Sequence, residues 1–249
     1  MKLFALAAIV FFGLSVPAFA EWKNMDSQIE DTNVILGMDG QAFCSGTIIS
    51  KKHRLVLTAA HCVNDAYSTK TVEIVDPKTG EISKRTVQTS QYLDVWQNKY
   101  DANYDVVSAA HVAAKPISRD QVTDVAILQI VDETWVPKQE APFAKKNQVV
   151  RGEIVYIVGN PAGTFDGSVS KGIVSNPHRK LRVTGSDPTP YFQTDAAAIG
   201  GNSGGAVYNG DGELIGVLSA GMNQSTITFA IPLKSIRALL VGAGFKEFE

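Results

Sequence analysis

The chain has 249 residues, 45% of them hydrophobic, and a formal net charge of -2. This length and composition suffice for one large domain or for two lobes of about 110 residues each. The Lys and Arg residues are scattered and nearly balanced by acidic residues. This distribution argues against a nucleic-acid partner, because binding phosphates requires clustered positive charge.

The first 20 residues have the pattern of a secretory signal peptide. Lys2 gives a charged start, residues 3–14 are almost wholly apolar, and Ala18-Phe19-Ala20 places small residues before a cleavage site at Glu21. The alternative is an uncleaved membrane anchor, but the apolar run is short for a span of about 20 residues. We therefore expect a mature chain 21–249, exported to the periplasm or the extracellular space, without stable membrane insertion.

The sequence contains only two cysteines, Cys44 and Cys62. An exported protein meets an oxidising compartment, so a disulfide between them is the natural expectation. In the chain-entropy model, closing this loop stabilises the fold by about 3 kcal/mol. The alternative is a pair of free buried thiols.

Short apolar runs separated by turn-forming residues predict strands along the mature chain. In chain order the runs are 46–49, 55–58, 71–75, 83–88, 125–131, 153–158, 168–173, 181–184, 213–219 and 226–231. Turn signals stand at 76–80, 159–161, 186–188 and 209–212. Only residues 232–241 have helical spacing of their apolar residues. Many strands with one terminal helix indicate an all-β barrel or sandwich, and residues 132–148 are the best candidate for a linker between two lobes.

Three local patterns carry candidate catalytic residues. His61 follows an apolar run, within Thr58-Ala59-Ala60-His61-Cys62. Asp124 opens the predicted buried strand 125–131, and Ser203 stands inside Gly201-Asn202-Ser203-Gly204-Gly205. A serine hydroxyl becomes a useful nucleophile when an imidazole removes its proton, and the imidazole needs a buried acceptor to fix its tautomer.

Glycines around Ser203 allow a sharp turn that points backbone N–H groups at a developing oxyanion. Donors from Gly201 and Ser203, with Asn202, would form that oxyanion hole. Each residue alone has a simpler interpretation, and we interpret His53, His111 and His178 as ordinary histidines. Asp120 is an alternative acid, but it lies outside the buried strand and fits less well.

The order His, Asp, Ser separates this chain from subtilisins and α/β-hydrolases. Residues 44–47 and 58–63 resemble the first disulfide and the histidine region of trypsin-like serine proteases. The second half is similar to the HtrA/Deg subgroup, in the blocks 157–161, 171–175, 193–197, 201–205, 212–216 and 229–232. The resemblance implies an all-β fold of two six-stranded antiparallel β-barrels, at about 21–135 and 145–232, followed by a terminal helix at about 232–243.

The chain also departs from the family pattern. HtrA proteases usually carry PDZ domains after the protease domain, and this sequence ends at Glu249. Asn202 stands where trypsin has the aspartate that pairs with a newly cut N-terminus. We therefore expect no zymogen cleavage beyond signal removal. Residues 76–118 make the interval between His61 and Asp124 long for the HtrA pattern, and we expect an extended hairpin and surface loops there.

By the same resemblance, Ala197, Ala198, Ser219 and Gly221 belong to the specificity pocket, and Ser219 could also support Asp124. A pocket without a charged residue favours cleavage after small to medium apolar residues, because a cationic side chain would be desolvated without compensation. Asp195 fits a family sequence block instead of the pocket.

The sequence thus predicts a serine endopeptidase that acts on protein or peptide substrates, unfolded chains among them. The first alternative is a catalytically weak binding or holdase protein with the same fold. The second is an esterase or acyltransferase that uses the same oxyanion hole. We expect no cofactor and no metal, because no histidine or acid cluster has ligand spacing. The sequence leaves the oligomeric state open.

Overall fold

The computed structural model describes residues 22, 24–182, 188–222 and 225–249. The predicted signal peptide lies outside these described residues, as do parts of the predicted strand 181–184 and turn 186–188. In the described part of the chain, no helix combines the length and the apolar character needed to cross a membrane.

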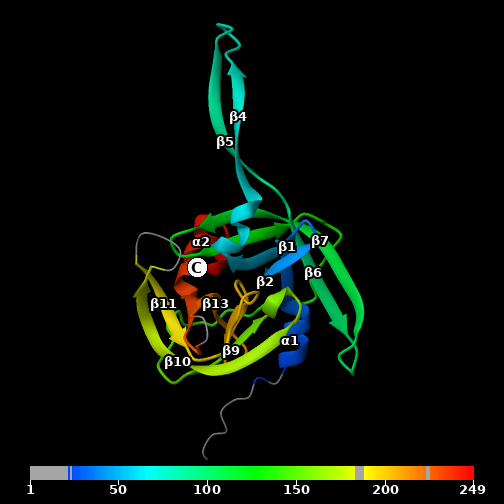
Figure 1. Cartoon of the computed structure of the whole chain (residues 1–249), viewed down its shortest axis with the longest axis vertical. Coiled ribbons are helices and arrows are strands. Elements are labelled where there is room, and N and C mark those ends of the chain that lie inside the picture. The colour runs from blue at the N-terminus through cyan, green and yellow to red at the C-terminus, as the bar shows by residue number, and fades with distance from the viewer. Residues whose placement is uncertain (1–21, 23, 183–187, 223–224) are drawn as a thin grey trace, which may run out of the picture.

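Two closed antiparallel barrels of six strands each form the body of the molecule (Figure 1). The first barrel has the order β1-β2-β3-β8-β7-β6, with β1 (Asn33–Met38), β2 (Gln41–Ser50), β3 (Leu55–Ala59), β6 (Leu93–Tyr100), β7 (Val106–Asp120) and β8 (Val125–Ile130). The second has the order β10-β11-β14-β13-β12-β9, with β9 (Ile154–Gly159), β10 (Ser168–Leu181), β11 (Thr189–Thr194), β12 (Ala206–Asn209), β13 (Leu214–Gly221) and β14 (Thr228–Pro232). The predicted fold class is confirmed.

Strand β3 explains how the two barrels join. All five of its residues are buried, although a strand with one solvent face would alternate. Val56 packs in the core of the first barrel, while Leu55 and Leu57 pack in the cluster that contains the core of the second barrel. Both faces of β3 are therefore covered, which accounts for its unbroken apolar sequence.

The terminal helix α2 (Leu233–Gly242) follows β14 directly, as the sequence predicted. Leu233, Ile236 and Leu240 are its buried residues. A second helix, α1 (Met25–Thr32), was not predicted. Its buried residues are Gln28, Ile29, Asp31 and Thr32. Three of these four are polar, so α1 lacks the apolar stripe by which a helix is recognised in a sequence.

A separate hairpin of β4 (Tyr67–Val75) and β5 (Ile82–Ser90) projects from the first barrel (Figure 1). The predicted turn is formed by Asp76, whose carboxylate accepts the N–H groups of Lys78 and Thr79 at 2.7 and 3.1 Å. Within the segment 76–118, the expected surface loops are short, such as the exposed residues 101–105. Most of the chain after the hairpin forms β6 and β7, which close the first barrel.

Candidate active site

His61 lies immediately after strand β3, in the 3-10 helix η1 (Ala60–Ala66). Its side chain is 34% exposed, so the imidazole remains accessible although the strand before it is fully buried. The sequence places an apolar run directly before the histidine, and that run fixes the histidine at the edge of the core.

Asp124 lies beside His61 and is completely buried. Its Oδ1 accepts the backbone N–H of His61 at 2.9 Å, and its Oδ2 is 2.9 Å from His61 Nδ1. The Asp124 carbonyl oxygen accepts the N–H of Ala60 at 2.9 Å. A carboxylate only accepts hydrogen bonds, so Nδ1 of His61 carries the proton and Nε2 is left as an acceptor.

The backbone of Asp124 has φ +60°, a left-handed conformation that is costly for a residue with a side chain. The contacts with Ala60 and His61 hold this conformation. They direct the carboxylate at the imidazole, and they place an uncommon backbone geometry at the centre of the site.

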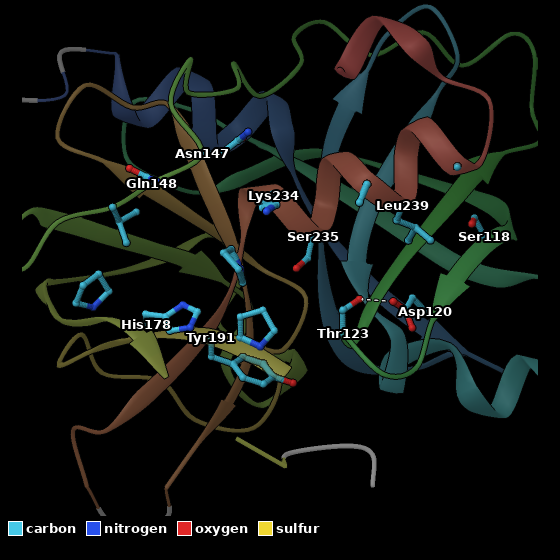
Figure 2. Close-up of a pocket in the computed structure, with 16 residues that line it drawn as sticks. Ser118, Asp120, Thr123, Asn147, Gln148, His178, Tyr191, Lys234, Ser235 and Leu239 are labelled. Atoms are coloured by element: carbon cyan, nitrogen blue, oxygen red, sulfur yellow. Dashed lines mark hydrogen bonds between the residues drawn. The ribbon is translucent and has the colours of Figure 1, made fainter. Parts of the chain in front are cut away.

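Asp120 closes the turn that leads into Asp124 (Figure 2). One of its carboxylate oxygens accepts the N–H of Val122 at 2.9 Å, and the other accepts the Thr123 hydroxyl at 2.8 Å. Both oxygens are therefore used within the turn. Of the two candidate acids, the structure brings Asp124 to His61.

Ser219, on β13, connects Asp124 to Ser203. Its hydroxyl donates to Asp124 Oδ2 at 2.5 Å, and its carbonyl oxygen accepts the Ser203 hydroxyl at 3.4 Å. Among the described residues, this is the one hydrogen bond that the Ser203 hydroxyl makes. The hydroxyl has no hydrogen bond to His61 there. The expected support of Asp124 by Ser219 is present.

The segment before Ser203 forms a tight turn over Ile199–Asn202. The N–H of Asn202 donates to the Ile199 carbonyl at 3.2 Å, and Gly201 has φ +97°. A positive φ at the third position is the mark of a type II turn. A side chain at Gly201 would also be excluded, because its Cβ would lie 2.5 Å from the backbone nitrogen of Ala162.

Two backbone N–H groups of the loop 201–205 have no acceptor among the described residues, those of Gly201 and Ser203. The N–H groups of Gly204 and Gly205 are bonded to Leu218 and Asn202. The sequence also assigned Asn202 to the oxyanion hole, and the structure contradicts this. The Asn202 N–H closes the turn and is not available to a substrate.

Cys44 and Cys62 form the predicted disulfide, with their Cα atoms 6.0 Å apart. Their sulfurs and the His61 ring form the one grouping of potential metal ligands in the described part of the chain. Both sulfurs are oxidised in the disulfide, so neither is a thiolate that could bind a metal.

A cavity of about 960 Å³ opens beside Ser203. Its described lining consists of Ala197, Ala198, Ile199, Gly200, Ser203, Leu218, Ala220, Gly221, Met222, Ser225, Thr226 and Ile227. None of these carries a charge. The predicted pocket residue Ser219 is not among them, because side chains alternate along β13 and that of Ser219 is directed at Asp124. Asp195 also lies outside this lining, and its carboxylate accepts the N–H of Ile173 at 2.7 Å.

The other histidines contact other parts of the described chain. His53 pairs with Glu247 at 2.8 Å and His111 pairs with Asp94 at 2.8 Å. His178 lines a second cavity, of about 900 Å³, together with Thr123, Tyr191 and Leu239 among others (Figure 2).

Two closed six-stranded barrels with a terminal helix define the chymotrypsin-like class of β proteins. The chain belongs to the family of the trypsin-like peptidase domain, whose model matches residues 44–217. The chain is thus a trypsin-like peptidase domain, and it is similar to serine proteases described as HtrA-like.

Two curated relatives with the name "Serine protease HtrA-like" illustrate the similarity. The one from Staphylococcus aureus strain MRSA252 is 34% identical over 148 residues, covering 55% of this chain and 18% of the relative. The one from strain USA300 is 34% identical over 139 residues, covering 52% and 18%. The matched region is thus less than a fifth of the length of these relatives.

Two solved structures share the fold. Rv3671c from Mycobacterium tuberculosis H37Rv, in the inactive form of its Ser343Ala mutant, has a TM-score of 0.63 and 18% identity, with 92% of this chain and 94% of that chain covered. The serine endoprotease from Yersinia pestis has a TM-score of 0.61 and 23% identity, with 90% and 66% covered.

Sequence analysis missed two buried polar residues that contact this site, Ser45 and Asn160. Ser45 N–H donates to the Ser203 carbonyl at 2.8 Å. Asn160 follows β9 and donates from its backbone N–H to the Ser45 hydroxyl at 2.8 Å. The available signal was a polar residue inside the buried part of β2 and another directly after the apolar strand β9.

Proposed function

We propose that this protein is an endopeptidase that cleaves peptide bonds through an acyl-enzyme on Ser203. His61 is the general base and Asp124 orients it. The observation that carries this proposal is the buried Asp124 carboxylate, which bonds both the backbone N–H and Nδ1 of His61. This pairing leaves Nε2 of His61 as the acceptor for the proton of a nucleophile.

In the first step, His61 Nε2 takes the proton of the Ser203 hydroxyl as its oxygen attacks the substrate carbonyl. The hydroxyl must first leave the Ser219 carbonyl, which it meets at 3.4 Å. This contact is long, and rotation about one side-chain bond of Ser203 would exchange it for a different partner. Catalytic hydrogen bonds often tighten only when substrate is bound. His61 then gives the proton to the leaving amine, and a water molecule resolves the acyl-enzyme by the same route.

The negative oxygen of the tetrahedral intermediate would lie against the N–H groups of Gly201 and Ser203. These groups support the role because they have no acceptor within the described protein and belong to the nucleophile itself and to the residue two positions before it. Preorganised backbone donors of this kind stabilise an oxyanion without reorganising during the reaction.

The cavity beside Ser203 favours substrates with small to medium apolar residues, such as Val, Ala or Leu, before the cleaved bond. Its described lining has no charge to offset desolvation of Lys or Arg. The disulfide is consistent with export to an oxidising compartment after cleavage before Glu21. Protein and peptide substrates, unfolded ones among them, are the expected partners.

Turnover of unfolded casein by residues 21–249 tests the function, next to a Ser203→Ala variant and a fluorophosphonate inhibitor. We expect cleavage by the wild type alone and a covalent adduct on Ser203 by mass spectrometry. A folded wild-type protein that neither cleaves casein nor forms the adduct would contradict the proposal. Sequencing the products gives the residue preference.

A further inference from the structure

The turn over Ile199–Asn202 has a second accessible conformation. Rotating the peptide between Gly200 and Gly201 by about 180° turns a type II turn into a type I turn, with φ near -90° at Gly201. In a planar trans peptide the N–H points opposite to the carbonyl, so this rotation would also turn the Gly201 N–H away from its present direction. Two adjacent glycines present no steric barrier to such a change. Contacts from outside the turn must select the observed conformation.

Ser45, on β2 of the first barrel, contacts both residues of the proposed oxyanion hole. Its hydroxyl donates to the Gly201 carbonyl at 2.7 Å, and its N–H donates to the Ser203 carbonyl at 2.8 Å. Ser45 is completely buried, so water does not compete for these bonds. One residue of the first barrel thus holds two residues of the second.

Asn160 determines the direction of the Ser45 hydroxyl. Its backbone N–H and its side-chain Nδ2 both donate to Ser45 Oγ, at 2.8 and 3.1 Å. With both lone pairs of the oxygen occupied, the hydroxyl proton is directed to Gly201.

The Asn160 side chain is itself fixed in one orientation. Its Nδ2 donates to the Val34 carbonyl at 2.8 Å, and its Oδ1 accepts Asn33 Nδ2 at 2.7 Å and the N–H of Gly167 at 3.0 Å. Asn160 is completely buried. Its amide therefore uses all its donors and acceptors, which makes it a rigid support for the Ser45 hydroxyl.

The residues after Asn160 hold the rotating peptide directly. The N–H of Ala162, in η2 (Pro161–Gly163), donates to the Gly200 carbonyl at 2.7 Å. Ala162 has φ +56°, an uncommon conformation for alanine that the surrounding contacts must maintain. Because the Gly200 carbonyl points at Ala162, the Gly201 N–H points the other way.

We propose that Ser45 and Asn160 are positioning residues of the oxyanion hole. The Ser45 hydroxyl, oriented by Asn160, selects the turn conformation in which the Gly201 N–H is available to the substrate. This role rests on the proposed function of Ser203, and it acts through Gly201 without touching the substrate.

The test compares wild type with Ser45→Ala and with Ser50→Ala. Ser50 is the matched control, because it is a buried serine on the same strand whose hydroxyl contacts only the N–H of His53, at 3.2 Å, among the described residues. The readouts are kcat and KM on an apolar peptide substrate, and the inhibition constant of a peptide boronic acid, whose tetrahedral adduct places an oxygen in the hole.

For Ser45→Ala we expect kcat to fall by about 10- to 100-fold, KM to stay within about threefold, and boronate affinity to fall in parallel with kcat. Ser50→Ala should match the wild type in kcat, in KM and in boronate affinity. If Ser45→Ala does not fold, the pair Ser45→Thr and Ser45→Val makes the same comparison, since a hydroxyl of threonine is replaced by a methyl group in valine. The threonine variant should then keep more kcat than the valine variant.

A folded Ser45→Ala protein with kcat within twofold of wild type would overturn the positioning role. Equal losses in Ser45→Ala and Ser50→Ala would overturn it as well. Failure of the proposed function is distinct, because wild type would then lack turnover that depends on Ser203. In that case crystal structures of the two variants test the positioning role. A flipped or mixed Gly200–Gly201 peptide in Ser45→Ala, but not in Ser50→Ala, supports positioning, and an unchanged peptide rejects it.

Discussion

The Ser219 hydroxyl lies 2.5 Å from Asp124 Oδ2, while the carbonyl of the same residue accepts the Ser203 hydroxyl. The proposed acid and the proposed nucleophile are thus held by one buried residue of β13. Replacing Ser219 with alanine removes the hydroxyl and leaves the carbonyl. We expect kcat/KM to fall about 10-fold, the equivalent of one hydrogen bond to a charged group.

Peptide hydrolysis by Ser219→Ala provides the measurement, with Ser68→Ala as the control. The Ser68 hydroxyl bonds Thr89 on the exposed β4–β5 hairpin, so its removal should leave the rate unchanged. An unchanged rate in Ser219→Ala as well would show that His61 and the backbone alone orient Asp124.

The two acids at the β7–β8 turn should differ sharply in their effect on catalysis. Asp124→Asn disturbs the tautomer of His61, and we expect kcat to fall by about ten-thousand-fold, as for the corresponding change in a catalytic triad. Asp120→Asn keeps an acceptor for the turn and should stay within about threefold. Steady-state rates of both variants make the comparison. A larger loss in Asp120→Asn would reassign the acid.

The proposed apolar pocket can be made smaller at Gly221. A Cβ there would meet its nearest neighbours, the carbonyl oxygens of Ala198 and Ile227, at 3.7 Å, which is ordinary contact. The variant Gly221→Val should therefore fold and fill part of the cavity. We expect kcat/KM for a substrate with Leu before the cleaved bond to fall at least about 10-fold, with a smaller loss for Ala. Paired peptide assays measure this, and equal losses would place the specificity pocket elsewhere.

Asp31 links stability to pH, because it is 1% exposed and bonds Lys99 at 2.6 Å and Lys138 at 3.2 Å. Burial raises the pKa of Asp31, but hydrogen bonds and charge from the two lysines outweigh it and hold the pKa below its ordinary value. Such a carboxylate stabilises the fold above its unfolded pKa, about 4, and this stabilisation is lost as pH falls through the lower folded pKa.

We therefore expect Asp31→Asn to lower the free energy of unfolding by about 1–3 kcal/mol at neutral pH. The difference from wild type should shrink at an acidic pH below about 4, because the pKa of Asp31 is lowered and its carboxylate becomes protonated only in that range. Urea unfolding at neutral and at this acidic pH tests this, with Glu30→Gln as a control, since the Glu30 carboxylate approaches Lys99 only to 3.7 Å. A difference that does not depend on pH would contradict the ionic role.

Short apolar runs predicted an all-β fold, and the resemblance to trypsin-like proteases predicted the two six-stranded barrels. The acid next to His61 was predicted because its signal is local. The unbroken apolar strand β3 ends beside His61, and Asp124 borders an equally apolar strand. Helix α1 escaped prediction since its buried face is largely polar, with Gln28 and Asp31 satisfied by partners distant in sequence. Burial of a polar residue on a helix can be predicted only when the residue that satisfies its hydrogen bonds is known.

The role we propose for Ser45 and Asn160 escaped prediction for a related reason. The two residues are 115 positions apart, on different barrels, and their bond follows from how the barrels meet. Asn202 was misassigned because a glycine-rich segment does not indicate which of its N–H groups the turn itself consumes.

Strand β3 has its two faces in different cores, with Val56 on one side and Leu55 and Leu57 on the other. Natural selection therefore acts on this short segment from two directions, since any replacement must suit both halves of the molecule at once. Neither barrel could change its sequence freely at β3, and the same constraint applies to His61, which follows this strand. We expect substitutions to accumulate more slowly in β3 than in the projecting hairpin, most of whose residues are exposed.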